Sequence, residues 1–263
     1  MTPVPFYTPA VVQVRDLYFG YEADRPVVSG LSADLMPGRL CALIGPNAAG
    51  KTTLLRLMMG QLRPWSGHVL AAGLSVWRMP PRRRASWLSY VPQRGAVSFA
   101  FTVEQVVAMG RYALASNSGA IEHALTACDL GAIRQRVYAA LSAGQQQRVL
   151  LARAIAQCGQ TGRVMLLDEP ASAMDLWHVH RTMRLLGNMA RSGLAVAAVL
   201  HDLNLAARYA DDVWLLHEGR IAASGRWDEV LAPQVLEPVY RVGLTSVPQP
   251  GEDRPMFVTR LDG

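Results

Sequence analysis

The sequence predicts an α/β fold with a mainly parallel sheet, an N-terminal antiparallel β region and an inserted helical subdomain. Three observations support this prediction. Short, wholly apolar runs occur in the first and last thirds of the chain, as expected for strands buried on both faces of a parallel sheet. An N-terminal segment is rich in β-forming residues. The middle of the chain, from Thr102 to about Gln157, has a helical pattern with no strong strand candidate.

Composition is typical of a folded globular protein. The chain has 263 residues, of which 51% are hydrophobic and 17% are charged, the reverse of the balance in disordered chains. No apolar run reaches the roughly 18 residues needed to span a bilayer. The N-terminal residues 1–10 lack the pattern of a secretory signal. We therefore expect one large domain, with or without an inserted subdomain, that stays in the cytosol.

The net charge of +6 leaves three kinds of partner open: nucleic acid, an anionic membrane surface or a nucleotide. The densest basic run, Arg82–Arg84, is predicted to be a solvated loop, and contact with lipid headgroups or an acidic partner is the alternative. No basic stripe is interleaved with aromatic residues, so no nucleic-acid partner is expected. The three cysteines, Cys41, Cys128 and Cys158, are odd in number and widely spaced, and we expect reduced apolar fillers.

The first third of the chain predicts two strand regions and a helix. Residues 11–21 form the β-rich N-terminal segment. Pro37 and Gly38 mark a turn before Leu40–Ile44, five apolar residues that predict a buried strand. A glycine-containing loop follows, and residues 52–60 then show a helical pattern that ends at a glycine.

Further strands are predicted on both sides of the helical middle. Residues 88–91 form a short strand candidate before it. After it, the apolar runs at 164–167 and 195–200 predict buried parallel strands. Residues 213–216 and 220–223 flank a Glu-Gly turn and predict a hairpin. The proline-containing tail beyond residue 233 predicts mixed structure.

Residues 45–52, with the sequence GPNAAGKT, fit the phosphate-loop pattern GxxxxGK[ST] between a predicted strand and a predicted helix. Two glycines let the backbone N–H groups turn toward phosphates, and the helix directs its positive dipole end at the same anions. Lys51 is expected to pair with the β- and γ-phosphates, Thr52 to ligate Mg²⁺, and Thr53 to help hold the α-phosphate. The loop residues expected to contact the nucleotide are Gly45, Pro46, Asn47, Ala48, Ala49, Gly50, Lys51, Thr52 and Thr53.

Two carboxylates end the apolar run at 164–167. Strand ends in a parallel sheet project toward the ligand edge. Asp168 is expected to help hold Mg²⁺, through water. Glu169 is expected to point elsewhere, because neighbouring strand residues alternate, and to orient or deprotonate the water that attacks the γ-phosphate. The alternative is a plain polar strand-to-loop junction, which the upstream phosphate loop disfavours.

Residues 141–148, with the sequence LSAGQQQR, resemble the signature motif of ABC transporter ATPases, usually LSGGQ followed by a polar run and Arg. The resemblance covers nearly the whole chain, because the phosphate loop, the signature and the Asp-Glu pair follow in the family's order. It implies a RecA-like P-loop NTPase core. It also implies a single ABC ATPase domain over 1–263, with a core of about 1–97 and 159–263 and a helical subdomain of about 98–158.

The resemblance implies roles for an aromatic residue and a glutamine before the helical segment. Tyr21, thirty residues before Lys51, matches the aromatic that stacks on adenine, while Tyr18 and Phe19 are nearby candidates or core residues. Gln93 matches the Q-loop glutamine, which reaches Mg²⁺ or the lytic water and links to the transmembrane partner.

Two further matches follow the Asp-Glu pair. Residues 172–175, Ser-Ala-Met-Asp, resemble the D-loop, which implies that Asp175 crosses a dimer interface. His201, at the end of a predicted strand, matches the switch histidine that contacts the γ-phosphate.

Two alanines depart from the family pattern. Ala48 replaces a frequent glycine at a variable position of the phosphate loop. Ala143 replaces the first glycine of the signature pair, and its methyl group is expected to alter ATP affinity without abolishing activity. Ser142, Gly144 and Gln145 keep the remaining signature residues.

In this family the signature of one chain completes the ATP site of a second copy. The resemblance therefore implies a head-to-tail dimer with two ATP molecules. Ser142 and Gly144 are expected to donate hydrogen bonds to the γ-phosphate, with Ala143 and Gln145 beside them. Hydrolysis of the shared γ-phosphate would open the dimer and drive a membrane partner. The expected cofactors are ATP and Mg²⁺.

Residues 101–112 and 200–211 are similar to iron-chelate importer ATPases, a group that serves ferric siderophores, haem and cobalamin. This similarity implies a peripheral subunit on the cytoplasmic face of the inner or plasma membrane, which powers uptake through a separate permease. An extracytoplasmic substrate-binding protein would take part indirectly. The alternatives are an ABC exporter ATPase, a non-transport ABC ATPase acting on nucleic acid or ribosomes, and a small-molecule P-loop kinase.

Overall fold

The computed structural model describes residues 10–93, 95, 97, 99–158, 163–251 and 253–260. Residues 1–9 lie outside these ranges, and with them most of the segment predicted to lack a secretory signal. The predicted subdomain boundaries at 98 and 159 also lie outside them. In the described part of the chain, no helix is both long and apolar enough to cross a membrane.

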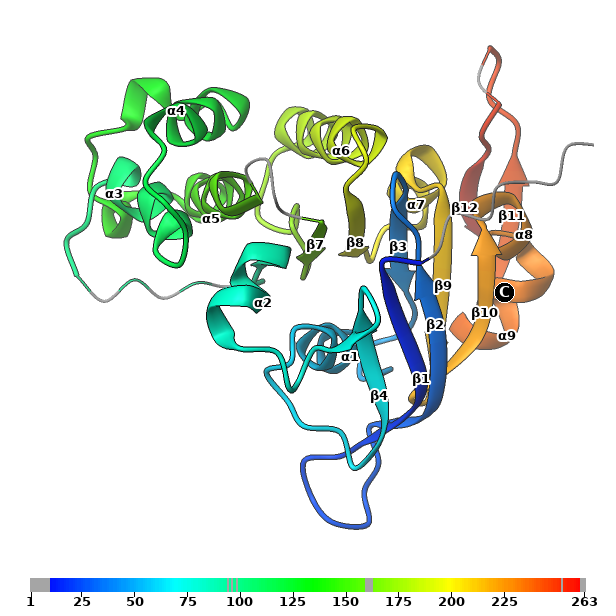
Figure 1. Ribbon diagram of the computed structural model, residues 1–263. Helices are drawn as coiled ribbons and strands as arrows, with labels where there is room; N and C mark the ends of the chain where they lie inside the picture. Colours follow the sequence, from blue (N-terminus) through cyan, green and yellow to red (C-terminus); the bar gives the residue numbers. More distant parts are fainter. Residues whose placement is uncertain are drawn as a thin grey trace, which may run out of the picture.

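A six-stranded sheet lies at the centre of the fold (Figure 1). Its strands pair in parallel, except for the antiparallel pair at one edge. The predicted strands in 40–44, 88–91, 164–167 and 195–200 and the predicted hairpin are confirmed to within a few residues. In spatial order the strands are β10 (Arg220–Arg226), β9 (Asp212–His217), β3 (Leu40–Ile44), β8 (Ala195–Val199), β7 (Val164–Leu167) and β6 (Leu88–Val91).

A four-stranded antiparallel sheet confirms the predicted N-terminal β region. The predicted strand within residues 11–21 is the second strand in spatial order, with its neighbours on both sides. In spatial order the strands are β2 (Val28–Leu35), β1 (Val12–Phe19), β4 (Ser66–Ala71) and β5 (Leu74–Ser75).

Residues 103–158, between β6 and β7, are mainly helical, and in Figure 1 they lie to one side of the parallel sheet. Its first helix begins at a capping box, in which Thr102 and Gln105 exchange side-chain and backbone hydrogen bonds. The long helix α5 packs against both α3 and α4. The elements are α3 (Val103–Ala108), η1 (Met109–Arg111), α4 (Ser118–Ala127), η2 (Gly131–Ile133), η3 (Tyr138–Ala140) and α5 (Ala143–Cys158).

The structure shows which elements form in the basic run and in the C-terminal tail. The Arg82–Arg84 run was predicted to be a loop, which is wrong: it lies in a short helix that begins with proline at its first position, where a missing N–H costs nothing. The mixed tail contains a helix and a hairpin. The remaining elements are α1 (Lys51–Met58), α2 (Pro81–Trp87), α6 (Leu176–Arg191), α7 (Leu203–Tyr209), α8 (Trp227–Val230), α9 (Pro233–Tyr240), β11 (Gly243–Val247) and β12 (Met256–Arg260).

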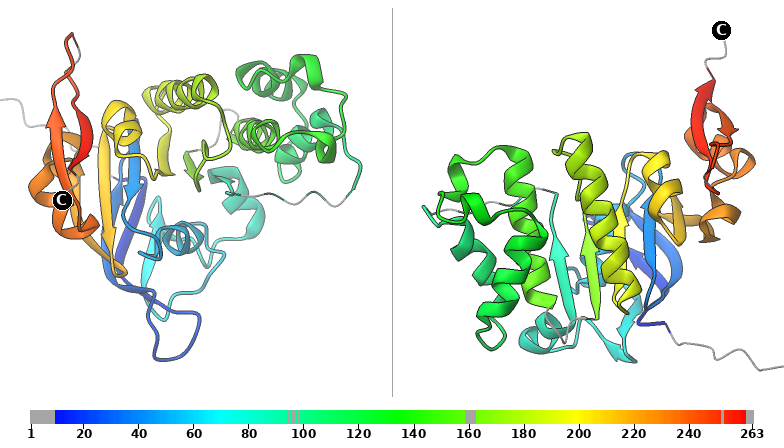
Figure 2. Two further views of the ribbon diagram at one scale, coloured as in Figure 1. Left: turned by 180° about the vertical axis from the view of Figure 1, so that it is seen from behind. Right: turned by 90° about the horizontal axis from the view of Figure 1, so that it is seen from above.

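The two faces of the parallel sheet support two separate cores. Along β3, Leu40, Ala42 and Ile44 pack into one core with α5, α6 and α7. Cys41 and Leu43 point to the opposite face and pack with α1 and the antiparallel sheet. Figure 2 shows the α3–α5 helices and the C-terminal hairpin at opposite ends of the molecule. The carboxyl ends of β3, β6, β7 and β8 share one edge, where the candidate site lies.

Candidate active site

The phosphate loop connects β3 to α1, as the sequence predicts. Gly45 has φ 141°, and an added Cβ there would lie 2.1 Å from the carbonyl oxygen of Leu216 in β9. Gly50 has φ 98° and precedes α1 directly. Ala48 also has a left-handed φ, 63°, which costs roughly 1–2 kcal/mol for a residue with a Cβ. This cost explains why glycine is frequent at that position of the motif.

Lys51 is held inside the loop that it follows. It is 7% exposed, and its Nζ donates hydrogen bonds of 2.8 Å to the carbonyl oxygens of Gly45 and Pro46. Burial lowers the pKa of Lys51, while the nearby carboxylates of Glu169 and Asp168 oppose that shift. The ammonium group is therefore anchored at the mouth of the loop, where a bound phosphate would meet it.

Thr52 and Asp168 form a pair of oxygen ligands. The Thr52 hydroxyl donates a 3.0 Å hydrogen bond to Oδ1 of Asp168, whose residue is 2% exposed. Burial raises the pKa of Asp168, and the hydroxyl of Thr52 opposes this. A hydroxyl and a carboxylate are hard oxygen donors of the kind that Mg²⁺ prefers. The two side chains fit a magnesium site.

Tyr90 is a site residue that the sequence reasoning missed. It lies on β6, and its hydroxyl donates a 3.5 Å hydrogen bond to Oδ2 of Asp168. Burial, followed by the charge of Asp168, raises the pKa of Tyr90 to about 12, so its hydroxyl keeps its proton. Tyr90 lies three residues before Gln93 on a predicted strand, but no motif assigns it a role. Gln93 itself is exposed and follows β6 at the same edge of the sheet.

Glu169 and His201 lie at the ends of the neighbouring strands β7 and β8. The Nε2 of His201 is 2.6 Å from Oε1 of Glu169. Glu169 lies beyond the end of β7 and has φ 50°, so a left-handed backbone turn, and not the predicted strand alternation, sets the direction of its side chain. The structure brings these two predicted residues together.

Tyr21 is 57% exposed, and its hydroxyl lies 3.3 Å from the hydroxyl of Thr53 in α1. Its ring contacts the edge of Phe19 at a centroid distance of 5.1 Å. Phe19 is buried and has a packing role, while Tyr18 is 41% exposed and its hydroxyl covers Gly30. Of the two exposed rings, that of Tyr21 contacts the phosphate-loop helix, through Thr53.

The signature residues begin α5. Ser142 Oγ accepts a hydrogen bond from the backbone N–H of Gln145, and Gln145 Oε1 accepts one from the N–H of Ser142. This reciprocal capping satisfies two backbone N–H groups at the start of the helix. Among the described residues, no hydrogen bond or ion pair joins residues 142–145 to the phosphate loop of the same chain. Instead, these residues share a cavity of about 440 Å³ with the D-loop, where Asp175 caps α6.

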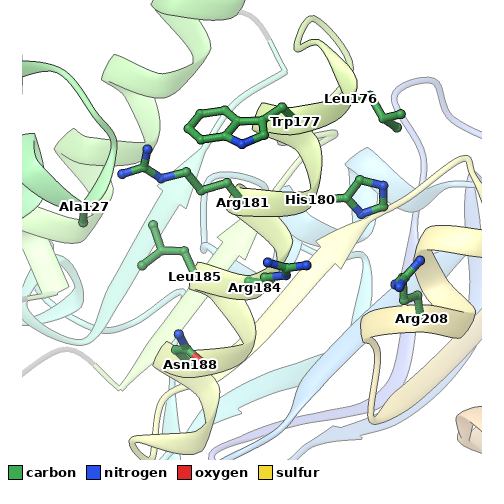
Figure 3. A pocket seen from close by; sticks show the side chains of 9 residues that line it. All are labelled: Ala127, Leu176, Trp177, His180, Arg181, Arg184, Leu185, Asn188 and Arg208. Carbon is green, nitrogen blue, oxygen red and sulfur yellow. The ribbon is translucent and has the colours of Figure 1, made fainter. Parts of the chain in front are cut away.

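A larger cavity of about 870 Å³ lies over the outer face of α6, beyond the D-loop (Figure 3). The guanidinium of Arg181 lies over the ring of Trp177, 5.1 Å from its centroid. On the α7 side, Nδ1 of His180 lies 2.7 Å from the hydroxyl of Tyr209. No residue of the phosphate loop lines this cavity, so it is separate from the site at the sheet edge.

Comparison with known proteins gives consistent matches. The family model for ABC transporters matches residues 28–172. A hemin import ATP-binding protein, HmuV, from Pseudomonas entomophila is 41% identical over 240 residues, covering 89% of this chain and 94% of that protein. HmuV from Pseudomonas aeruginosa is 42% identical over 246 residues, covering 90% and 95%. A solved structure described as an inward-facing metal-chelate type ABC transporter has a TM-score of 0.79 and 27% identity, covering 96% and 98%.

Proposed function

The chain belongs to the ABC transporter family of ATP-binding subunits, and on that premise we propose that it powers import of a metal chelate of the haem type. Family membership makes it an ATPase coupled to transport. The observation that supports the cargo class is the 41–42% identity, over about nine-tenths of the chain, to proteins named for hemin import. The metal-chelate transporter neighbour supports the same class.

ATP hydrolysis is assigned to residues at the sheet edge. Lys51 and the backbone of residues 45–53 bind the phosphates, and the ring of Tyr21 stacks on the adenine. Thr52, Asp168 and Gln93 hold Mg²⁺, which when bound neutralises charge on the β- and γ-phosphates. The buried, paired oxygens of Thr52 and Asp168 support this assignment.

Glu169 is the proposed general base for the attacking water. Its contact with His201 supports this role, because the imidazole fixes the carboxylate at the edge where the γ-phosphate would lie. His201 then contacts the γ-phosphate itself. Release of that phosphate removes the partner of His201 and the target of the water that Glu169 activates.

Two copies form the working unit. Subunits of this family act as dimers with a transmembrane permease. We assign Ser142, Ala143, Gly144 and Gln145 of one copy, with Asp175, to the ATP held by the other. The supporting observation is that the signature and D-loop share a surface apart from the phosphate loop of their own chain.

The proposed domain organisation is a core of about 1–97 and 159–263 with a helical subdomain of about 98–158.

Two aromatic side chains at the start of the helical subdomain are exposed. Phe99 is 72% exposed and Tyr112 is 95% exposed. Such exposed aromatic rings favour a protein partner. We assign this surface to the permease, so that the chain works as a peripheral subunit on the cytoplasmic face of the membrane. A substrate-binding protein on the far side delivers the cargo.

Reconstitution with the permease tests the cargo. The purified chain, its permease and a candidate binding protein are assembled in proteoliposomes, and ATPase activity is measured with haemin, a ferric siderophore and cobalamin. We expect haemin to stimulate hydrolysis and to accumulate on the side of the membrane that carries the ATPase subunit. Stimulation by cobalamin or the siderophore alone would reject the haem assignment, while absence of any ATPase activity would reject the assignment of the reaction.

A further inference from the structure

The signature motif and the D-loop of one chain form a single surface. A Cβ added at Gly144 would lie 2.6 Å from the carbonyl oxygen of Ala173 in the D-loop, a contact that real Cβ atoms essentially never make. Arg148, one turn further along α5, lines the same cavity as Asp175 and His178. The position of the D-loop is therefore linked to that of the signature helix.

Asp175 makes two different kinds of contact with His178. Its Oδ1 accepts a 2.9 Å hydrogen bond from the backbone N–H of His178, which caps α6. In addition, the ring Nδ1 of His178 lies 2.9 Å from Oδ1 and 3.0 Å from Oδ2. An ionised carboxylate only accepts hydrogen bonds, so Nδ1 is the donor. The pKa of Asp175 is lowered, first by the backbone bond and then by the ring bond.

The environment of His178 favours one ring orientation. Its side chain is 22% exposed, whereas that of Asp175 is 68% exposed. The ring of Trp177 contacts it edge-to-face at a centroid distance of 4.7 Å. Its Nε2 is buried and has no hydrogen-bond partner in the described part of the chain. The imidazole is thus held on the protein side, while the carboxylate that it contacts faces outward.

These contacts separate a structural role from a functional one. Any residue at position 178 with a backbone N–H can cap α6 through Oδ1 of Asp175. The imidazole adds the bond that also reaches Oδ2 and so fixes the rotation of the carboxylate. A carboxylate that only capped a helix would lose a little stability without this second bond. One that must meet a partner in a defined orientation would also lose ordering, and with it turnover.

We propose that His178 is a positioning residue, which fixes the carboxylate of Asp175 for contact with the nucleotide site of the second copy. This inference rests on the head-to-tail dimer proposed above. In this role His178 acts through Asp175 and not on the nucleotide itself.

The test is steady-state ATPase activity of the purified full-length chain carrying His178→Ala. We expect kcat to fall roughly tenfold, the loss expected for one hydrogen bond to a charged group, with the KM for ATP changed less than about threefold. The melting temperature should stay close to that of the parent, because the backbone cap is retained. His178→Asn, whose amide can donate to the carboxylate, should recover part of the lost kcat.

Two controls make the result specific. His180→Ala removes the neighbouring histidine of α6, whose ring contacts Tyr209 rather than the D-loop, and should leave kcat unchanged. In an Asp175→Asn background, His178→Ala should add little further loss, because the two side chains act as one unit. Parental kcat in His178→Ala, an equal loss in His180→Ala, or additive losses in the double variant would overturn the inference.

A Glu169→Gln background distinguishes this inference from the proposed function. If the chain with Glu169→Gln forms a dimer with ATP, and His178→Ala alone has parental kcat, only the role of His178 fails. If ATP induces no dimer with Glu169→Gln, the head-to-tail arrangement fails, and the inference falls with it. We expect an ATP-dependent dimer both with and without His178→Ala.

Discussion

The Nε2 of His201 lies 2.6 Å from Oε1 of Glu169, across the ends of two neighbouring parallel strands. The chain separates these residues by 31 others, but the sheet brings them to one edge. An imidazole in contact with a carboxylate can orient it for proton abstraction. The relationship therefore places the proposed base and the proposed phosphate sensor in direct contact.

Glu169→Gln should abolish turnover while leaving ATP binding intact. An amide is nearly the same size as a carboxylate but does not accept a proton from water, so we expect kcat to fall by about 10²–10⁴. The measurement is phosphate release, together with gel filtration in ATP to detect a stable dimer. Glu122→Gln, at an exposed position of α4, is the matched control. Near-parental turnover in Glu169→Gln would refute the assigned base.

Asp168→Asn should stabilise the nucleotide-free chain while it abolishes ATPase activity. Burial raises the pKa of Asp168 above its unfolded-state value of about 3.9. The native state therefore favours the protonated form, and this contribution to stability is lost as pH rises through the raised pKa. At pH 7 the buried charge is unfavourable, and its removal should raise the melting temperature by about 2–4 °C.

The pH dependence of the rise in melting temperature checks whether the buried charge of Asp168 is its cause. The difference in melting temperature should be present at pH 7 and should disappear below about pH 4, where Asp168 is protonated in both states. Mg²⁺–ATP should stabilise the parent chain but not the variant. A lower melting temperature for Asp168→Asn at pH 7 would show that the carboxylate contributes to folding instead.

The two small residues of the signature should respond in opposite ways. Gly144→Ala places a methyl group 2.6 Å from the backbone oxygen of Ala173, so the D-loop or the helix must shift. We expect loss of the ATP-dependent dimer. Ala143→Gly removes an exposed methyl group from the surface that would meet the partner's phosphate. It should lower the KM for ATP by about two- to fivefold, equivalent to roughly 0.5–1 kcal/mol.

Tyr21 should contribute to ATP affinity through its ring. Tyr21→Ala should raise the KM for ATP by about 5- to 150-fold, since stacking on a base is worth roughly 1–3 kcal/mol. Tyr21→Trp should retain most of the affinity. Tyr21→Phe removes only the 3.3 Å contact between the hydroxyl groups of Tyr21 and Thr53, and it should raise the KM for ATP less than Tyr21→Ala does. Equal KM values for Tyr21→Ala and the parent would remove this residue from the site.

The sequence predicts the parallel strands well because their signal is local. Leu40–Ile44 and Val164–Leu167 are apolar throughout, as strands buried on both faces must be, and both are observed with the predicted bounds. The strands β2 and β4 were not located, because their half-exposed pattern includes glycine and several polar residues. Arg82–Arg84 was mistaken for a loop, because charge density obscured a proline-initiated helix.

The candidate site was predictable wherever a motif fixes residue type and spacing. The structure brings together Thr52 with Asp168 and Glu169 with His201, which the motifs name separately. Tyr90 was missed because its role depends on pairing between β6 and β7, which no single segment encodes. His178 was missed for a related reason. Its ring contact with Asp175 depends on a rotamer, and a sequence motif carries no such information.

The central claim is that ATP is held between two copies of this chain. The most direct measurement is a crystal or cryo-EM map of the Glu169→Gln chain with Mg²⁺ and ATP. We predict that the hydroxyl of Ser142 from one copy lies within hydrogen-bonding distance of a γ-phosphate whose other contacts come from Lys51 of the second copy. A map in which bound ATP contacts Lys51 while both copies of Ser142 lie remote from any nucleotide would contradict the account.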